Sequence, residues 1–338
     1  MPESLRAHGD AAERPPLMEY RTLGSTGLAI SVLAFGAGPV AQTMTVGSRT
    51  EQLACVRSAL AAGINWFDTA PGYGAGESER SLGACLRELA GTSPVHVATK
   101  VRLQPQDLQQ PYAAVRRSLE GSLERLGLSR VTLLQLHNMV AEARGRLPDA
   151  LSVEDVLGPG GVLAALERLR EEGLALHLGL TAAGSPMAAA AVLATREFAA
   201  AQVPYHVLNP SAGRRMPQGW PEQDYGCLID VCQRYGTGVL AIRVLAGGAL
   251  TGKPPSPRTR NTRYFPLDLY QRDAQRAALL AARLPAGSSL AELALRFVIG
   301  DPRVASAIIG FATPLEIEQA VRAAARGPLA PHEMAGML

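Results

Sequence analysis

Lysine, aromatic residues and long apolar runs are all scarce in this chain. Lys100 and Lys253 are the only lysines among 33 basic residues, and aromatic residues make up 5% of the sequence. Arginine carries the other basic charges, so a lysine at the end of an apolar run suggests a compact ammonium whose pKa can be shifted. The most apolar stretch, residues 188–194, is far too short to cross a bilayer. We therefore expect no membrane partner.

The cysteines show no spacing typical of a disulfide framework or a zinc site. There are four, with no Cys-x-x-Cys motif, at positions 55, 85, 227 and 232. This pattern favours reduced thiols in an intracellular protein, and no metal site is expected. Residues 1–17 are polar and lack the apolar segment of a signal peptide, so they are predicted to form a disordered tail. A cytoplasmic location follows as an expectation.

The overall composition is that of a soluble globular protein. Hydrophobic residues account for 47% and charged residues for 19%, which allows a large core. The net charge of +3 is small, and the arginines alternate with acidic residues on predicted helices. We therefore expect no nucleic-acid partner.

From residue 18 onward, strand-like and helix-like segments alternate. Residues 20–23 and 28–30 flank a Gly-Ser-Thr-Gly turn and predict a β-hairpin. Strand-like runs follow near 31–35, 64–68, 95–100, 131–137, 176–181, 200–205, 238–244 and 304–309. Helical segments lie near 50–62, 78–89, 111–126, 161–172, 185–197, 222–235, 271–283 and 313–325, with an additional one near 288–299. This alternation predicts an α/β fold, a (β/α)8 TIM barrel with an N-terminal β-hairpin, in competition with an open doubly wound sheet.

Ionisable side chains stand at or just beyond the ends of three successive predicted strands. They are Asp68 and Tyr73, then Lys100, then His137. Taken singly, each has an ordinary structural interpretation, such as a loop-capping aspartate or a core histidine. A parallel sheet brings its C-terminal strand ends to one face, however, and α/β barrels place their chemistry there. The four together therefore predict a catalytic site.

Several motifs in this order resemble the aldo-keto reductase family. They are Asp68-Thr-Ala-x-x-Tyr73-Gly followed by Gly76, Ser78 and Glu79, the strand ends at Lys100 and His137, Gln202-Val-Pro-Tyr205, Leu250-Thr-Gly-Lys253 and Ile308-Ile-Gly310. The resemblance extends over residues 20–325, and the first motif is the most specific. It implies a single barrel domain over residues 18–330, with the hairpin closing the bottom of the barrel.

The resemblance also implies a carbonyl–alcohol oxidoreductase with a small-molecule carbonyl or alcohol substrate. In this interpretation Tyr73 donates the proton to the carbonyl oxygen and accepts it in the reverse direction. Lys100 stabilises the tyrosinate, Asp68 holds Lys100, and His137 hydrogen-bonds the carbonyl oxygen.

The family's cofactor is a nicotinamide dinucleotide, so NAD(H) or NADP(H) is expected. Gln202 matches the family's carboxamide-binding glutamine. The loops after the seventh and eighth strands are the usual phosphate site of such barrels. The predicted cofactor-binding residues are Gly36, Thr181, Gln202, Leu245, Gly247, Gly248, Leu250, Gly310, Phe311, Thr313 and Glu316.

The sequence departs from the family pattern in three places. The family's Ser-Asn pair is Thr181-Ala182, and the aromatic residue that stacks on the nicotinamide is missing from residues 241–244. The arginine that clamps the 2′-phosphate aligns with Glu316, which would repel a phosphate and suit a free ribose hydroxyl. This favours NAD over the family's usual NADP.

Long loops after predicted strands, at residues 140–160, 211–221 and 253–270, belong to the predicted catalytic face. Trp220, Tyr264 and Phe265 on two of them are candidates for the wall of a substrate pocket, or for packing within the loops.

Two other functions remain open. A Rossmann-type dehydrogenase is suggested by Gly72, Gly74 and Gly76, although that spacing does not fit its motif. A non-catalytic, nicotinamide-binding regulatory subunit of the same fold, as in potassium-channel β subunits, is the other.

Overall fold

The computed structural model describes residues 18–89, 91, 94–261, 267–284 and 287–335. The predicted tail, residues 1–17, and the two aromatic residues Tyr264 and Phe265 lie outside this part of the chain.

The described chain contains a closed barrel of eight parallel strands, as predicted. In spatial order the strands are β10 (Phe198–Pro204), β11 (Gly238–Ile242), β12 (Val304–Ile309), β3 (Leu33–Gly36), β4 (Trp66–Asp68), β5 (His96–Val101), β6 (Val131–Leu136) and β9 (Ala175–Thr181). Because every strand is parallel to its neighbours, all eight C-terminal ends emerge on the same face.

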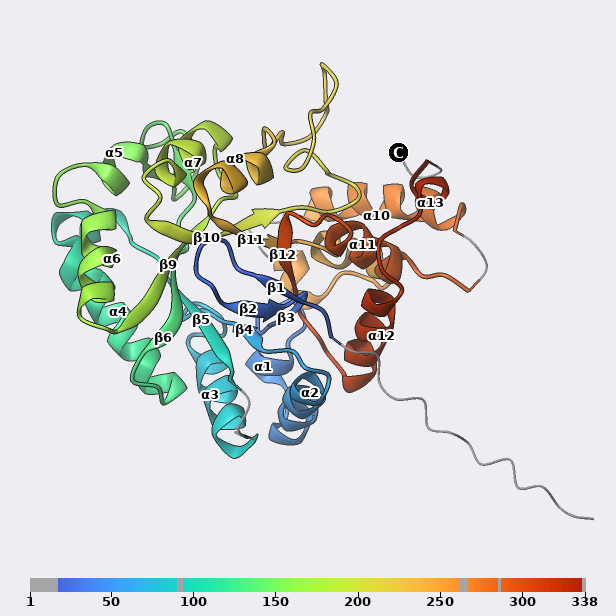
Figure 1. Ribbon diagram of the computed structural model, residues 1–338, viewed down its shortest axis with the longest axis horizontal. Coiled ribbons are helices and arrows are strands. Elements are labelled where there is room, and N and C mark those ends of the chain that lie inside the picture. Colours follow the sequence, from blue (N-terminus) through green and yellow to red (C-terminus); the bar gives the residue numbers. More distant parts are fainter. Residues whose placement is uncertain (1–17, 90, 92–93, 262–266, 285–286, 336–338) are drawn as a thin grey trace, which may run out of the picture.

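Helices surround the barrel, as Figure 1 shows. The main ones are α2 (Arg49–Ala61), α3 (Glu77–Leu89), α4 (Pro111–Leu126), α6 (Val162–Glu171), α7 (Pro186–Leu193), α8 (Leu228–Tyr235), α10 (Leu267–Ala281), α11 (Leu290–Ile299) and α12 (Pro314–Ala325). Each predicted helical segment corresponds to one of these, with ends shifted by a few residues. The largest shift is at α8, which begins at Leu228 after a long loop.

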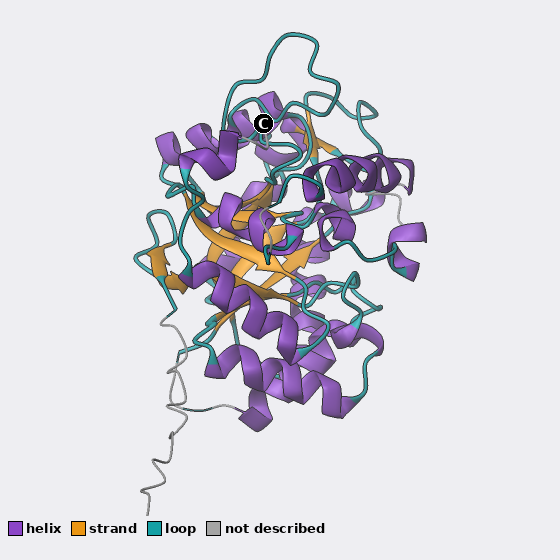
Figure 2. Ribbon diagram, turned by 90° about the vertical axis from the view of Figure 1, so that its right-hand side faces the viewer, coloured by secondary structure: helices purple, strands orange, loops and turns teal. Residues whose placement is uncertain are grey.

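The predicted hairpin forms from β1 (Tyr20–Thr22) and β2 (Ala29–Ser31). Figure 2 places it at one end of the barrel. Leu23 and Ile30 are fully buried and pack with the inward-facing side chains of the strands, among them Trp66, Ala98 and Leu133. The hairpin therefore closes the N-terminal end of the barrel with apolar side chains and leaves the C-terminal end for the site.

Several short elements were not predicted because each is too brief for a periodic pattern. They are α1 (Thr43–Val46), η1 (Pro105–Gln109), β7 (Val140–Ala141), β8 (Leu151–Ser152), α5 (Val153–Leu157), η2 (Ala246–Thr251), α9 (Pro257–Asn261) and α13 (Pro331–Ala335). Three of them, β7, β8 and α5, organise the long loop at residues 140–160. No helix in the described residues is long and apolar enough to span a membrane.

Candidate active site

The barrel interior changes from apolar to polar between two layers of side chains. Trp66, Ala98, Leu133 and Ala200 belong to the apolar cluster beneath the site. Alternate residues of a strand face the same side, so the residues two positions further along point inward one layer higher. These residues are Asp68, Lys100, Gln135 and Gln202. The strand period thus places four polar side chains together near the C-terminal end of the barrel.

Lys100 and Asp68 form the central ion pair of this layer. Lys100 Nζ donates to Asp68 Oδ1 at 2.5 Å and to the Thr69 carbonyl oxygen at 2.9 Å. The side chains are 1% and 5% exposed. Burial alone would lower the pKa of Lys100, but Asp68 and then Tyr73 oppose it, and the net pKa shift is upward. The ammonium is therefore held charged.

Asp68 is held by a second donor. Gln202 Nε2 donates to Asp68 Oδ2 at 2.6 Å, so each carboxylate oxygen accepts an N–H bond. Burial raises the pKa of the Asp68 carboxyl above its usual range, and the Lys100 ammonium and the Gln202 amide oppose that rise only in part. The ionised form is the one that accepts from both donors.

Tyr73 and His137 lie above the ion pair. Lys100 Nζ is 4.9 Å from the centroid of the Tyr73 ring. The Tyr73 and His137 rings meet edge to face with centroids 5.9 Å apart. Burial, with Lys100 and then Arg102 nearby, lowers the pKa of His137 to about 3. A neutral imidazole carries one N–H donor, so His137 can donate a hydrogen bond without carrying charge. The structure thus brings all four predicted catalytic side chains together.

The segment that carries Tyr73 is anchored by buried polar side chains. Ser78 Oγ donates to the Ala37 carbonyl at 2.7 Å and lies 2.8 Å from Thr69 Oγ1. The next residue, Glu79, is fully buried. It accepts from Thr99 at 2.5 Å and from Arg125 Nε at 2.7 Å. These bonds fix the loop between β4 and α3 against β5, which carries Lys100.

A second glutamine contact joins the neighbouring strands β6 and β9. Gln135 Nε2 donates to Thr181 Oγ1 at 2.9 Å, and Gln135 is fully buried. Its Oε1 has no hydrogen-bond partner among the described residues. Thr181 itself pairs in register with Gln202. Gln135 was not among the predicted site residues, although it lies two residues before His137 on the inward-facing side of its strand, which was a usable signal.

The loops after β11 and β12 are joined by an ion pair. Lys253 Nζ donates to Glu316 Oε1 at 2.7 Å, and Glu316 Oε2 accepts from the Ala312 amide at 2.7 Å. Thr313 caps α12 by accepting from the Glu316 amide. Glu316 therefore stands in the first turn of α12, as predicted, with its charge balanced by the other lysine of the chain. That pairing was not foreseen.

Two of the predicted cofactor positions are glycines with left-handed backbone conformations. Gly247 and Gly248 have φ values of 65° and 104°, a left-handed region that favours glycine. A Cβ on Gly36 would come within 3.1 Å of the Ile309 carbonyl oxygen. By contrast, Leu250 and Phe311 are buried in apolar clusters, so their side chains serve packing. Leu245 lies between Val244 and η2, and Gly310 directly follows β12.

The three predicted pocket-wall residues are only partly located. Trp220 lies in the loop before α8, and its buried Nε1 has no partner among the described residues. The nearby Glu222 binds Arg272 and Arg276 of α10, which ties this loop to that helix. Tyr264 and Phe265 lie outside the described residues, so their role stays a prediction.

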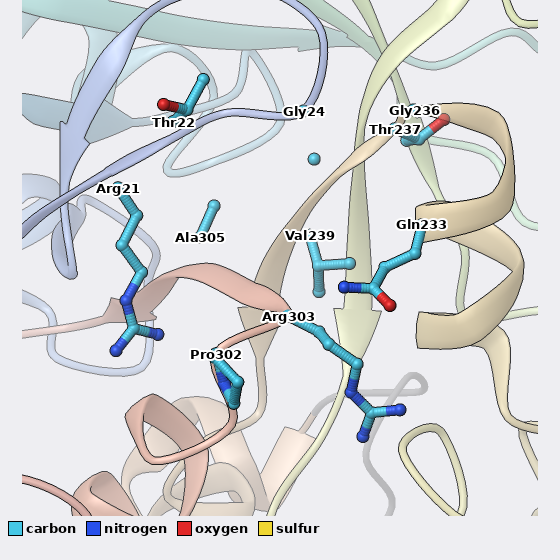
Figure 3. Close-up of a pocket in the computed structure, with 11 residues that line it drawn as sticks. Arg21, Thr22, Gly24, Gln233, Gly236, Thr237, Val239, Pro302, Arg303 and Ala305 are labelled. Atoms are coloured by element: carbon cyan, nitrogen blue, oxygen red, sulfur yellow. The ribbon is translucent and has the colours of Figure 1, made fainter.

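A cavity of about 410 Å³ lies at the opposite end of the barrel, beside the hairpin and the starts of β11 and β12. Figure 3 shows Arg21 and Arg303 on either side of Pro302 there. Both guanidinium groups are occupied. Arg21 binds Glu19 and three carbonyl oxygens, and Arg303 binds Asp301 and Asp230. This cavity therefore offers no free charge for a ligand.

The described residues also contain no group of three or more histidine, cysteine or acidic side chains placed to hold a metal.

A closed parallel barrel with a polar constellation at its C-terminal mouth is the architecture of the aldo-keto reductases. The model of the Aldo/keto reductase family matches residues 32–337, so the chain belongs to this family. L-galactose dehydrogenase of Arabidopsis thaliana is 28% identical to it, over 90% of this chain and 88% of that one. A probable voltage-gated potassium channel subunit beta of Oryza sativa is 26% identical, over 90% and 91%.

The fold is also that of a solved aldo-keto reductase. The holo form of an enzyme from Bacillus halodurans aligns with a TM-score of 0.67 and 23% identity, covering 95% of each chain. Membership of this family, with a dehydrogenase of a sugar among the relatives, makes the chain an oxidoreductase.

Proposed function

We propose that this chain interconverts a carbonyl compound and its alcohol, with Tyr73 as the proton donor and acceptor. One observation carries the proposal: the buried Lys100 ammonium touches both Asp68 and the Tyr73 ring. An ammonium at this place stabilises negative charge on the phenol oxygen. Asp68 keeps that ammonium charged although it is buried.

The proton moves between Tyr73 Oη and the substrate oxygen. During reduction, negative charge develops on the carbonyl oxygen, and Tyr73 supplies a proton to it. In oxidation the phenolate takes the proton from the alcohol. His137, neutral and beside the Tyr73 ring, donates a hydrogen bond to the same oxygen and orients the substrate.

A nicotinamide dinucleotide supplies or accepts the hydride when it is bound. The residues present fit such a group. Thr181 and Gln202 form a polar pair at the mouth of the barrel, beside an orphaned glutamine oxygen. The Gly248 amide already donates to the Leu245 carbonyl oxygen, so the proposed pyrophosphate site is the start of α12, approached over the side-chain-free backbone of Gly247 and Gly248. Gly36, Leu245, Gly310 and Thr313 complete this proposed binding surface.

We propose NAD(H) as the preferred form. Glu316 places a carboxylate where a 2′-phosphate would need a cation, and the nearby Lys253 is already engaged by that carboxylate. A ribose hydroxyl could donate to Glu316 instead. The substrate class that we propose is aldoses and other small aldehydes, since a relative is named for L-galactose.

Turnover with a panel of sugars and aldehydes, followed at 340 nm with each cofactor, tests the proposal. We expect activity with at least one substrate class and no requirement for added metal. The alternative is a regulatory subunit that binds nicotinamide without turnover. It gains some support from the relative named as a channel subunit and from the departures from the family pattern at Ala182 and within residues 241–244. Tight cofactor binding with no turnover on the whole panel would favour that alternative.

A further inference from the structure

Gln135 holds a buried amide oxygen that nothing in the described protein satisfies. Its side chain is fully buried on β6, and its Oε1 lacks a partner. An unsatisfied buried acceptor destabilises a fold, whereas an apolar side chain of similar size would not. One layer below, the same strand carries Leu133. Packing therefore gives no reason for an amide at position 135.

The nitrogen of the same amide has a defined task. Gln135 Nε2 donates to Thr181 Oγ1 at 2.9 Å. A hydroxyl that accepts in this way still has its own hydrogen to donate. Thr181 is 8% exposed at the end of β9, and the next residue is Ala182, which has no side-chain donor. The Thr181 hydroxyl is thus left as a side-chain donor at this strand end.

Gln202 offers a hydrogen-bond acceptor beside the Thr181 donor. Its Nε2 donates to Asp68 Oδ2, and Asp68 when ionised can only accept. The Gln202 oxygen is thereby left as an acceptor. Because Thr181 and Gln202 are paired across β9 and β10, one donor and one acceptor stand side by side. A primary carboxamide presents the matching acceptor and donor.

We propose that Gln135 is a positioning residue that turns the Thr181 hydroxyl into a donor for the carboxamide oxygen of the nicotinamide. The proposal rests on the nicotinamide cofactor proposed above. In this role Gln135 compensates for the side-chain amide of the family's asparagine, which is Ala182 in this chain. The unsatisfied Gln135 oxygen lowers the free energy of unfolding, and this cost is offset by the correct orientation of the bound nicotinamide ring.

The test measures dissociation constants by titration, with thermal unfolding alongside. In Gln135→Leu, or in Gln135→Met if the first variant folds poorly, we expect NAD binding to weaken about tenfold. This corresponds to about 1.4 kcal/mol. The unfolding temperature should stay the same or rise. Ser306→Ala is the matched control, because Ser306 also carries a buried orphaned oxygen. It should leave the dissociation constant unchanged.

Two further comparisons isolate the Thr181 route. In a Thr181→Val background, Gln135→Leu should weaken NAD binding no further. The 3-acetylpyridine analogue keeps the carbonyl acceptor, so the Gln135→Leu loss should persist with it. The thionicotinamide analogue replaces that oxygen with sulfur, a weak acceptor, so the loss should shrink to within about threefold.

Several results would overturn the inference. One is an unchanged dissociation constant in Gln135→Leu, and another is an additive loss in the double variant. A lower unfolding temperature with intact binding would make Gln135 merely structural. The acetylpyridine analogue lacks the amide NH2. If Gln135→Leu no longer weakened binding of this analogue, the Thr181 hydroxyl would be accepting from that NH2 rather than donating to the carbonyl oxygen. Wild-type protein that binds no nicotinamide dinucleotide would overturn the proposed function, and this inference with it.

Discussion

Asp68 and Lys100 form an ion pair at 2.5 Å inside the barrel, with 5% and 1% of their side chains exposed. Paired charges buried to this extent depend on each other, because either one alone would be left unsolvated. The pair sits directly beneath Tyr73. Its charge state therefore affects both the stability of the barrel and the proton held by the tyrosine.

Replacing Asp68 with asparagine should destabilise the protein strongly. The variant keeps the shape of the side chain but leaves the Lys100 ammonium buried without a counter-charge. Removing one partner of a buried pair costs about 3–5 kcal/mol. Urea unfolding at pH 7 measures the loss. As a control, Glu318→Gln removes one partner of an exposed pair with Arg322 and should cost less than about 1 kcal/mol. Equal effects of the two variants would show that the buried pair is not special.

Acidification should destabilise the fold partly through His206. Burial, together with Arg243, Arg276 and Arg272, lowers the pKa of His206 to about 3. In the unfolded chain a histidine titrates near 6.5, so below that pH the unfolded state binds the extra proton. Stability contributed by neutral His206 is therefore full above about pH 6.5 and is lost as the pH falls towards 3, by about 1.4 kcal/mol per pH unit.

His206→Gln removes this titration. Urea unfolding at pH 7, 6 and 5 should give a shallower decline for the variant than for wild type, by about 1.4 kcal/mol per pH unit in the acidic range. Other histidines with lowered pKa values, such as His137, contribute equally to both proteins and cancel in the difference. Parallel curves for the two proteins would contradict this prediction.

Cofactor preference should depend on Glu316. A 2′-phosphate would meet the Glu316 carboxylate, whereas a ribose hydroxyl can donate to it. We therefore expect wild type to bind NAD(H) as well as NADP(H) or better. Glu316→Arg should shift the ratio of affinities towards NADP(H) by about tenfold or more.

Lys253→Met is the control for that prediction. Lys253 pairs with Glu316. If that pair opened, the Lys253 ammonium would be free to contact a 2′-phosphate. If Glu316 governs the choice, Lys253→Met should weaken NADP(H) further and leave Glu316→Arg able to switch the preference. A strong wild-type preference for NADP(H), unchanged in Glu316→Arg, would place the phosphate elsewhere.

The barrel and the four strand-end residues could be predicted because both follow from local patterns. The periods of strands and helices can be recognised within short stretches of sequence. The strand ends then place Asp68, Lys100 and His137 on the C-terminal face of the barrel. The carboxylate–ammonium pairing of Asp68 and Lys100 also follows from their chemistry once they share a layer.

Contacts between distant segments could not be predicted in the same way. Lys253 meets Glu316 across 63 residues of sequence. Gln202 reaches Asp68 rather than facing only a ligand, across 134 residues. Such pairings depend on how the closed barrel and its loops bring distant segments together, and no sequence period encodes that. Gln135 was overlooked because a glutamine inside an apolar strand has no motif of its own.

The most direct test of the account is turnover by Tyr73→Phe. This change removes one hydroxyl and keeps the ring beside Lys100 and His137, so the fold and cofactor binding should persist. The rate with the best carbonyl substrate should fall by at least about a thousandfold, while the dissociation constant for the cofactor should change less than about threefold. Residual turnover within about tenfold of wild type would contradict the assignment of Tyr73 as the proton donor.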